Sequence, residues 1–233
     1  MNLADQILYE DNHLIALNKR AGQIVQGDKT GDLCMADEIK AYLKQRDGKP
    51  GNVFCGVVHR LDRPVSGVVV FAKTSKALGR MNELVKGRDF RKTYLAVVKN
   101  APPASAGHLE DFLVRNEKMN KSFVTTDTAR PDAKLASLDY RLLGVSKGGY
   151  HLLEVDLHTG RHHQIRCQLA HIGCPVKGDL KYGAPRSNPD GSICLHSYRL
   201  SFQHPVRHEE VTIEAPMPWP EMNFEQISNN INQ

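Results

Sequence analysis

The sequence lacks the features that mark several special classes of protein. No apolar run approaches the roughly 18 residues that a membrane-spanning helix needs. The first 20 residues mix acidic side chains with short apolar stretches, unlike a secretory signal. The five cysteines are odd in number and include no Cys-x-x-Cys pair, which argues against disulfide staples and a thiolate zinc site. Repeats and low-complexity tracts are also missing, so we expect a globular, cytoplasmic protein.

The charge balance is mildly basic. The chain of 233 residues carries 31 Lys and Arg against 26 Asp and Glu, and its 11 histidines add positive charge below neutral pH. This excess permits a polyanionic partner without proving one. The length suits one generous domain. We place that domain at residues 1–220 and expect a frayed polar tail at 221–233.

Hydrophobic spacing predicts more strands than helices. The strands are expected at residues 7–9, 13–18, 57–60, 68–72, 91–99, 135–143, 150–157, 193–202 and 211–215. Helices are expected at residues 33–45, 76–86 and 161–172, with Ser75 as a helix cap. Because the strands occur in hairpins more than in βαβ units, the prediction is an α+β fold with a mixed, largely antiparallel central sheet flanked by helices and loops.

A first candidate for chemistry is Asp62. It lies in a turn, residues 61–67, that Pro64 and Gly67 keep out of the neighbouring strands. Aspartates are ionised at neutral pH, and Arg60 and Arg63 stand beside this one. A carboxylate on a rigid turn is well placed to act as a catalytic group. The alternative is a simple turn residue whose neighbouring arginines are solvated.

A second candidate is the histidine-rich segment 158–166. On the predicted helix, His162 and Arg166 share a face at i, i+4. Histidines at 158, 162 and 163 suggest a metal site, but adjacent helical residues point about 100° apart, which disfavours a shared ion. The predicted helix start, with Arg161, is also an anion site. A solvated basic helix face is the alternative.

Lys92 and Tyr94 form a third candidate, because they share one face of a predicted strand. Tyr94 is either a half-buried packing residue or an active-site residue that stacks on a base.

Several ordered blocks resemble the RluA family of pseudouridine synthases. The block at residues 59–67 reads HRLDRPVSG. The others read ILYEDNHLIALNKRAG (7–22), FAKTSKA (71–77), RKTYLAVV (91–98), HTGRHHQIRCQLAHIGCPVKGDLKYG (158–183) and LHSYRLSFQHP (195–205). Two small departures are Val65 and His162, where the family more often has threonine.

This resemblance implies the pseudouridine synthase catalytic fold with a central RNA-binding cleft, and an isomerase that needs no cofactor or metal. Asp62 would be the catalytic carboxylate, acting either at C1′ or at the 2′ position of the nucleotide. Arg166 would orient Asp62 through an ion pair, and Tyr94 would stack on the uracil. The target uridine must be flipped out of its RNA, and Arg60 would take the vacated place.

The expected substrate is a structured rRNA or tRNA stem-loop, bound by a monomer. Many relatives carry an N-terminal S4-type domain, whereas this sequence opens with the catalytic block, so RNA affinity is expected to come from the catalytic domain. The RNA-binding candidates are His59, Arg60, Arg63, Lys92, Arg161, His162, His163 and Leu169. Two other hypotheses are a catalytically silent RNA-binding module of the same fold and a metal-dependent hydrolase using His158, His162 and His163.

Overall fold

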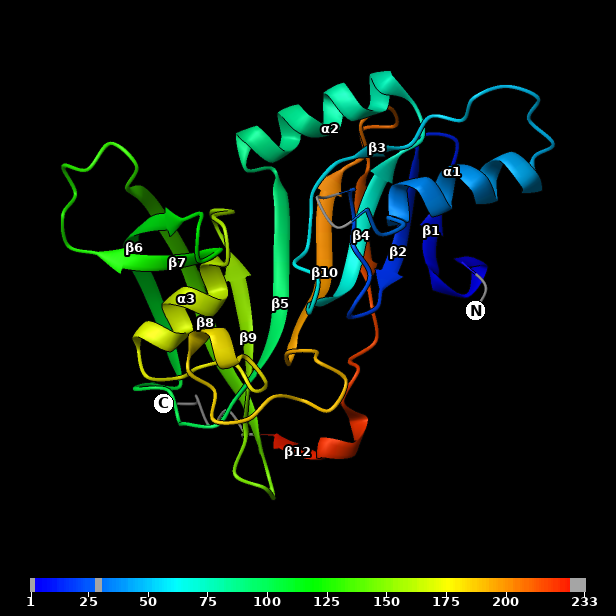
Figure 1. Ribbon diagram of the computed structural model, residues 1–233. Helices are drawn as coiled ribbons and strands as arrows, with labels where there is room; N and C mark the ends of the chain where they lie inside the picture. Colours follow the sequence, from blue (N-terminus) through cyan, green and yellow to red (C-terminus); the bar gives the residue numbers. More distant parts are fainter. Residues whose placement is uncertain (1–2, 28–30, 227–233) are drawn as a thin grey trace. The chain divides into compact units, whose positions relative to one another are not determined.

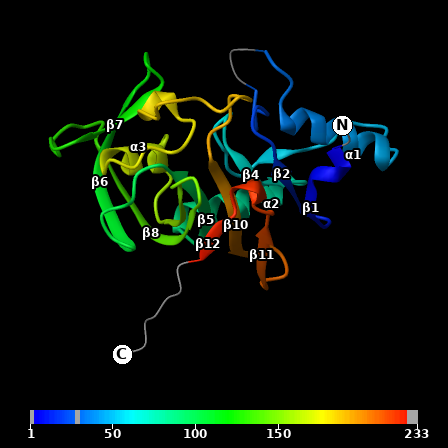
Figure 2. The same ribbon diagram turned by 90° about the horizontal axis from the view of Figure 1, so that it is seen from below.

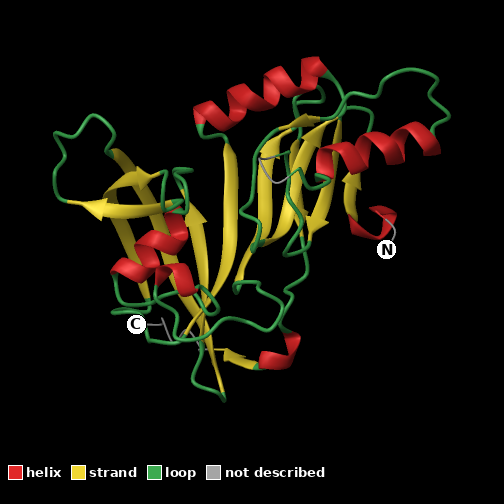
Figure 3. Ribbon diagram, viewed as in Figure 1, coloured by secondary structure: helices red, strands yellow, loops and turns green. Residues whose placement is uncertain are grey.

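The computed structural model describes residues 3–27 and 31–226. The chain divides into two compact units, each built from two stretches of sequence. Unit 1 comprises Met1–Lys92 and Ser197–Pro216, and unit 2 comprises Thr93–His196 and Met217–Gln233. The chain passes from one unit to the other within strands β5 (Phe90–Val98) and β10 (Leu195–Gln203), and again between Pro216 and Met217. Strands make up most of the regular structure (Figure 3).

Unit 1 is built around a sheet with the strand order β1-β2-β4-β10 (Figure 1). Its hairpin partners β1 and β2 are antiparallel, as are β2 and β4, and β10 and β11. The short strand β3 pairs with β4. The strands span β1 Ile7–Glu10, β2 Leu14–Lys19, β3 Gly56–Val57, β4 Ser66–Ala72 and β11 Glu210–Glu214. The helices are η1 Leu3–Gln6, α1 Met35–Arg46 and α2 Ser75–Gly87.

Both faces of the unit 1 sheet are buried at β4. Successive side chains of a strand point to opposite faces, so alternate residues of β4 enter two different apolar clusters. On β4, Val68 and Val70 pack with Met81 of α2, whereas Val69 and Phe71 pack with the apolar side of α1. Central strands covered on both faces read as continuous apolar runs, which explains the sequence VVVFA in β4.

Helix α2 starts one residue earlier than predicted. Thr74, not Ser75, is its N-cap, and the Thr74 Oγ1 accepts a hydrogen bond from the Ala77 N–H at 3.1 Å. At the other end Gly87 is the last helical residue, and the left-handed cap conformation is taken by Arg88 with a φ of 68°. The helix predicted at residues 76–86 is confirmed, but it extends one residue further at each end, from Ser75 to Gly87.

Unit 2 has the antiparallel strand order β5-β9-β8-β6-β7, with β12 paired to β8. Its strands span β6 Ala106–Asn116, β7 Lys121–Thr125, β8 Lys134–Ser146, β9 His151–Leu157 and β12 Phe224–Gln226. Its helices are α3 Gln164–His171, η2 Leu180–Tyr182 and η3 Pro220–Met222. Helix α3 lies against one side of strands β6 and β8 (Figure 2), where Cys167 packs on Ala136 and Leu113.

The other face of the unit 2 sheet carries polar side chains along β8. Along β8, Ala136, Leu138 and Tyr140 are buried. Their neighbours Ser137 and Asp139 are more accessible to solvent. This alternation is the pattern of an antiparallel sheet that is covered on one side.

The structure confirms the predicted α+β class and its largely antiparallel pairing. Three local predictions were wrong. Residues 58–60 are not part of a strand, and the third helix begins at Gln164 instead of residue 161. η3 at Pro220–Met222 and β12 at Phe224–Gln226 lie where a frayed tail had been expected from 221; residues 227–233 lie outside the described residues. Strands β6 and β7 were not predicted. None of the helices in residues 3–27 and 31–226 has the length and apolar character needed to span a membrane.

Candidate functional site

The loop that carries Asp62 is a tight turn in unit 1. The Val65 N–H donates to the Asp62 carbonyl oxygen at 3.0 Å, which places Arg63 and Pro64 at the centre of the turn. Gly67 follows with a φ of +112°, and a Cβ atom there would come within 2.2 Å of the Ser197 backbone oxygen. Only glycine fits this position, so the Ser-Gly pair of the HRLDRPVSG block has a steric reason.

Lys19 fixes the backbone of the Asp62 loop through hydrogen bonds. It is the last residue of β2 and is fully buried, directly opposite Gly67 in the sheet register. Its ammonium group donates to the carbonyl oxygens of Val65 at 2.6 Å, Arg63 at 3.1 Å and Asp62 at 3.2 Å. Burial lowers the pKa of Lys19 to about 7, while the nearby Asp62 opposes this shift. The loop backbone is therefore fixed by the buried amino group of Lys19.

His59 and Lys92 both lie beside the ring of Phe90. The His59 Nε2 accepts a hydrogen bond from the Val70 N–H at 3.2 Å, and the ring lies 5.2 Å from that of Phe90. Burial lowers the pKa of His59 to about 3, with Lys92 adding to the effect, so this imidazole is neutral at pH 7. Burial also lowers the pKa of Lys92. The RNA-binding role of both stays a prediction.

The two arginines of the loop are exposed. Arg63 pairs with Asp32 at 2.9 Å, and its carbonyl oxygen accepts from the Gly22 N–H at 2.8 Å. Beside it is an open hollow of about 440 Å³ whose lining includes Arg20, Gly22, Asp32 and Arg63. This hollow offers guanidinium groups close to the Asp62 turn.

In unit 2, Arg166 is clamped by a buried ion pair. Its Nε lies 2.6 Å from Asp179 Oδ2, and its Nη2 lies 2.9 Å from Asp179 Oδ1. The two side chains are only 6% and 1% exposed. The guanidinium also sits 5.1 Å from the centre of the Tyr182 ring. A bidentate pair of this kind fixes the orientation of the guanidinium plane.

His162 and His163 precede helix α3, which corrects their predicted place on it. His163 is the N-cap residue in the left-handed region, with a φ of 53°, and the two rings stack at 3.8 Å. His162 Nδ1 lies 2.9 Å from Ser122 Oγ, and His163 Nδ1 lies 3.0 Å from the Tyr182 hydroxyl. The predicted i, i+4 relation of His162 with Arg166 does not hold.

Thr159 and Gln164 anchor this segment to β8. The Ser137 N–H donates to Thr159 Oγ1 at 2.9 Å, and Gln164 Nε2 donates to the Ser137 carbonyl at 3.1 Å. Arg161 is half-buried, and its Nε donates to the Leu135 carbonyl at 2.8 Å. The helix begins after Arg161, so the predicted anion site at a helix start beside Gly160 is wrong.

Tyr94 lies on the α3 side of the unit 2 sheet. It pairs with Val155, which pairs with Tyr140, and this row shares its face with Ala136. Tyr94 is 6% exposed. Leu169 of α3 is fully buried, and its predicted place in a base pocket stays a prediction.

Three residues of these arrangements were missed by the sequence analysis: Lys19, Asp179 and Tyr182. All three stand inside blocks that carried the family resemblance, at 7–22 and 158–183. A lysine among apolar strand residues and an aspartate following a glycine were the only local signals.

The metal group suggested by His158, His162 and His163 is not assembled. In the part of the chain that the structure describes, the candidate metal-holding group that contains His158 joins it to His108 and Asp139. His162 and His163 instead bond Ser122 and Tyr182.

Comparisons with known proteins agree on one family. A family model described as RNA pseudouridylate synthase matches residues 13–171. "Ribosomal large subunit pseudouridine synthase D" of Xylella fastidiosa is 35% identical over 228 residues, covering 91% of this chain and 66% of that protein. An uncharacterized RNA pseudouridine synthase of Chlorobaculum parvum is 32% identical over 236 residues, covering 91% of this chain and 70% of that protein. This chain thus spans about two thirds of the length of these relatives.

A solved structure resembles the whole chain. The human RNA pseudouridylate synthase domain containing 4 superposes with a TM-score of 0.79 at 25% identity, covering 96% of this chain and 95% of that one. The predicted catalytic fold is therefore confirmed.

Proposed function

The chain belongs to the RNA pseudouridylate synthase family, and on that premise we propose that it isomerises a uridine of a structured rRNA or tRNA stem-loop to pseudouridine, with Asp62 as the catalytic carboxylate. The observation that carries the proposal is that the matched span, 13–171, contains Asp62 on its rigid turn together with Tyr94 and Arg166.

The reaction moves one bond and needs no redox partner. The N1–C1′ bond breaks, the uracil turns, C5 bonds to C1′, and the proton on C5 is lost while N1 gains one. A carboxylate serves this sequence either by adding to C1′ or by removing the proton at the 2′ position. Both routes need the carboxylate at a fixed place, which the Lys19-held turn supplies.

Arg166 is the proposed partner of Asp62. The two residues belong to different units, and their pairing stays a prediction. The bonds from Nε and Nη2 of Arg166 to Asp179 fix the orientation of its guanidinium plane. A guanidinium whose plane is already fixed loses little conformational entropy when it binds a second carboxylate.

The remaining candidates would hold the RNA. Tyr94 is proposed to stack on the flipped uracil, and Arg60 to fill the space that the base leaves. The predicted contacts to RNA are His59, Arg60, Arg63, Lys92, Arg161, His162, His163 and Leu169. We also propose that the two units act as the single catalytic domain predicted for residues 1–220.

The name of the Xylella fastidiosa relative refers to the ribosomal large subunit, which favours rRNA over tRNA as the substrate. The cytoplasmic location and the monomeric state stay predictions of the sequence.

The test is release of tritium from RNA that contains 5-tritiated uridine, with rRNA and tRNA assayed separately. We expect release by the wild-type chain and a loss of about 10⁴-fold in Asp62→Asn, with RNA affinity retained. The exposed Asp5→Asn change in the same unit is the matched control and should leave turnover unchanged.

Two outcomes would contradict the proposal. Turnover in Asp62→Asn equal to that of the wild type would remove Asp62 from the mechanism. A folded chain that binds RNA with a steep salt dependence but releases no tritium from any rRNA or tRNA would be the silent RNA-binding module.

A further inference from the structure

Three metal-binding side chains meet on the polar face of the unit 2 sheet, away from α3. We propose that His108, Asp139 and His158 bind a divalent transition-metal ion, with Zn²⁺ as the preferred one. The ligand atoms of these residues all lie within 4.8 Å of one another. The inference does not rest on the proposed function, because none of the three belongs to the predicted catalytic or RNA-binding set.

The sheet register brings the three residues together. His108 of β6 stands directly opposite Asp139 of β8, so their side chains share a face. Asp139 in turn stands opposite Asp156 of β9, and His158, two residues further along, falls on the same face. Three backbone segments thus supply one ligand each, and two of them are fixed by the hydrogen bonds of the sheet.

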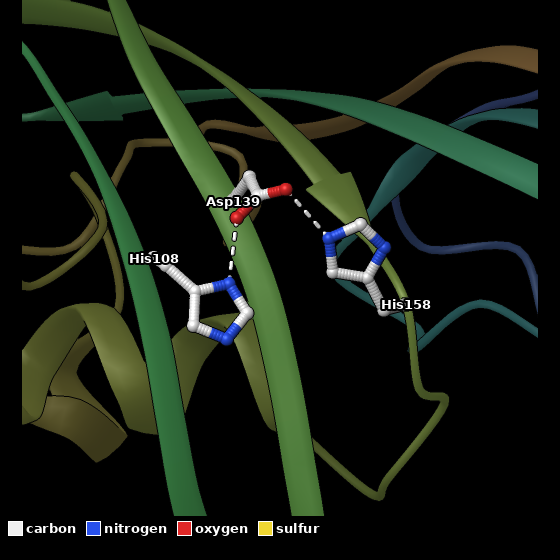
Figure 4. Close-up of side chains that lie close together, drawn as sticks. All are labelled: His108, Asp139 and His158. Carbon is white, nitrogen blue, oxygen red and sulfur yellow. Dashed lines mark hydrogen bonds and ion pairs between the residues drawn. The ribbon is translucent and has the colours of Figure 1, made fainter.

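The side chains are already turned toward one another (Figure 4). The Asp139 carboxylate lies between the two imidazoles: His108 Nδ1 is 2.7 Å from Oδ1, and His158 Nε2 is 2.7 Å from Oδ2. Zinc bonds to nitrogen and oxygen are about 2.0–2.2 Å long, so ligand atoms around a tetrahedral ion stand roughly 3.3 Å apart. The ligand atoms of the three residues lie within 4.8 Å of one another, so small side-chain rotations bring them to this spacing around one ion.

A neighbouring carboxylate can orient one of the ligands. Histidines that bind metals usually donate their second ring N–H to a carboxylate or carbonyl. Glu110 stands two residues from His108 on the same strand face, and its Oε2 is 3.8 Å from His108 Nε2. A small rotation of the Glu110 side chain completes that hydrogen bond while Nδ1 stays directed at the ion.

The ligand set selects the kind of metal. Two imidazole nitrogens and one carboxylate oxygen suit Zn²⁺, Ni²⁺ or Cu²⁺, whereas Mg²⁺ and Ca²⁺ prefer oxygen ligands alone. The surrounding charge favours a cation. The Arg141 guanidinium, on the same strand as Asp139, donates a hydrogen bond to Glu154 Oε1 at 2.7 Å. Glu110 beside His108 and Asp156 opposite Asp139 add negative charge near the three ligands.

A bound ion would connect β6 and β8 to the segment that leads from β9 into α3. That segment contains Thr159, which is hydrogen-bonded to Ser137 of β8. Because Tyr94 and α3 lie on the other face of the sheet, the ion would not touch Tyr94 or Arg166. Its expected effect is on the stability of unit 2.

The test is equilibrium dialysis of the full, tag-free chain against ZnCl₂ with the cysteines kept reduced. We expect one Zn²⁺ per wild-type chain and at least about tenfold weaker binding in His158→Asn and in Asp139→Asn. His208→Asn removes another exposed histidine, at a φ of 58° that asparagine tolerates, and should bind as the wild type does.

Two further measurements complete the test. Glu110→Gln should weaken binding by about 10- to 100-fold if Glu110 orients the ligand. Zn²⁺ should raise the melting temperature of the wild type and of His208→Asn but not of His158→Asn, which circular dichroism must show to be folded.

The proposal is overturned if the wild type binds no Zn²⁺ at 100-fold excess over about 1 µM chain, or if His158→Asn and Asp139→Asn bind as tightly as the wild type, which would assign the ion to other groups such as the cysteines. Tritium release is not part of this readout, so failure here leaves the isomerase proposal standing.

Discussion

The two units fix their candidate functional residues by different uses of buried charge. In unit 1, the fully buried Lys19 holds the turn of Asp62 through backbone carbonyls. In unit 2, a buried carboxylate, Asp179, holds the side chain of Arg166 directly. The first arrangement positions a segment of chain, and the second positions a single guanidinium plane.

The sheets that support these residues differ in the same way. Unit 1 covers both faces of its sheet with α1 and α2, so the Asp62 turn stands on a rigid, fully packed layer. Unit 2 packs α3 on one face of its sheet, and along β8 the other face carries polar side chains. Precision in unit 2 therefore depends more on individual polar contacts than on packing.

The largest expected effect is on the ion pair of unit 2. Asp179→Asn removes one charge of a buried ion pair, and we expect the free energy of unfolding to fall by about 3–5 kcal/mol. Urea denaturation measures it, with the exposed Asp190→Asn of the same unit as the control. A loss below about 1 kcal/mol would mean that the pair is not what organises Arg166.

Next comes the buried cation of unit 1. Lys19→Met fills the space but leaves three carbonyl oxygens of the Asp62 turn without their shared donor, and the expected loss is about 2–3 kcal/mol. The same denaturation experiment compares it with Lys76→Met, an exposed lysine on α2. If Lys19→Met costs more than Asp179→Asn, then unit 1 relies on buried charge more than unit 2.

A smaller effect is expected at Tyr182. Its hydroxyl accepts from the Ser122 N–H at 2.8 Å and lies 3.0 Å from His163 Nδ1. Tyr182→Phe leaves that buried N–H without its acceptor and should cost about 1–2 kcal/mol. Thermal unfolding is the measurement, and an unchanged melting temperature would contradict the dependence of unit 2 on polar contacts.

The smallest expected effect is a pH dependence of the free energy of unfolding, which comes from the titration of Lys19 in unit 1. The pKa of Lys19 is lowered from 10.5 to about 7 by burial. Between these values the unfolded chain holds a proton that the folded chain has lost, so stability rises with pH through this range. From pH 7 to pH 8 we expect Lys19 to contribute a gain of about 1 kcal/mol, which should be missing in Lys19→Met. Equal pH slopes in the two proteins would show that Lys19 keeps its proton.

Much of the fold was predictable because its periodicity is regular. The continuous apolar run of β4 and the alternation in β8 identify strands by the faces that they bury. The start of α3 was not predictable in this way. His163 takes a left-handed conformation that is uncommon for any residue except glycine and offers no side-chain cap, so the sequence contains no ordinary signal for a helix start there.

The site was predictable in its motif residues but not in the groups that hold them. Asp62, Tyr94 and Arg166 were identified from the resemblance of their blocks, and their roles stay predictions. Lys19 was missed because lysine at a strand end is usually exposed, whereas here the loop carbonyls solvate its ammonium group. Asp179 pairs with a residue 13 positions away across a loop, a separation that no periodic pattern reports.

The division of the chain has a consequence for its synthesis. The core of unit 1 contains Leu200, Phe202 and Ile213, which leave the ribosome only after all of residues 93–196 have been made. Until then Val68 and Val70 lack part of the apolar surface that covers them. Strand β4 also cannot pair with its neighbour β10 before β10 has been made. The segment made first is therefore among the last to be completed, and a nascent chain arrested near residue 196 should present exposed apolar surface to chaperones.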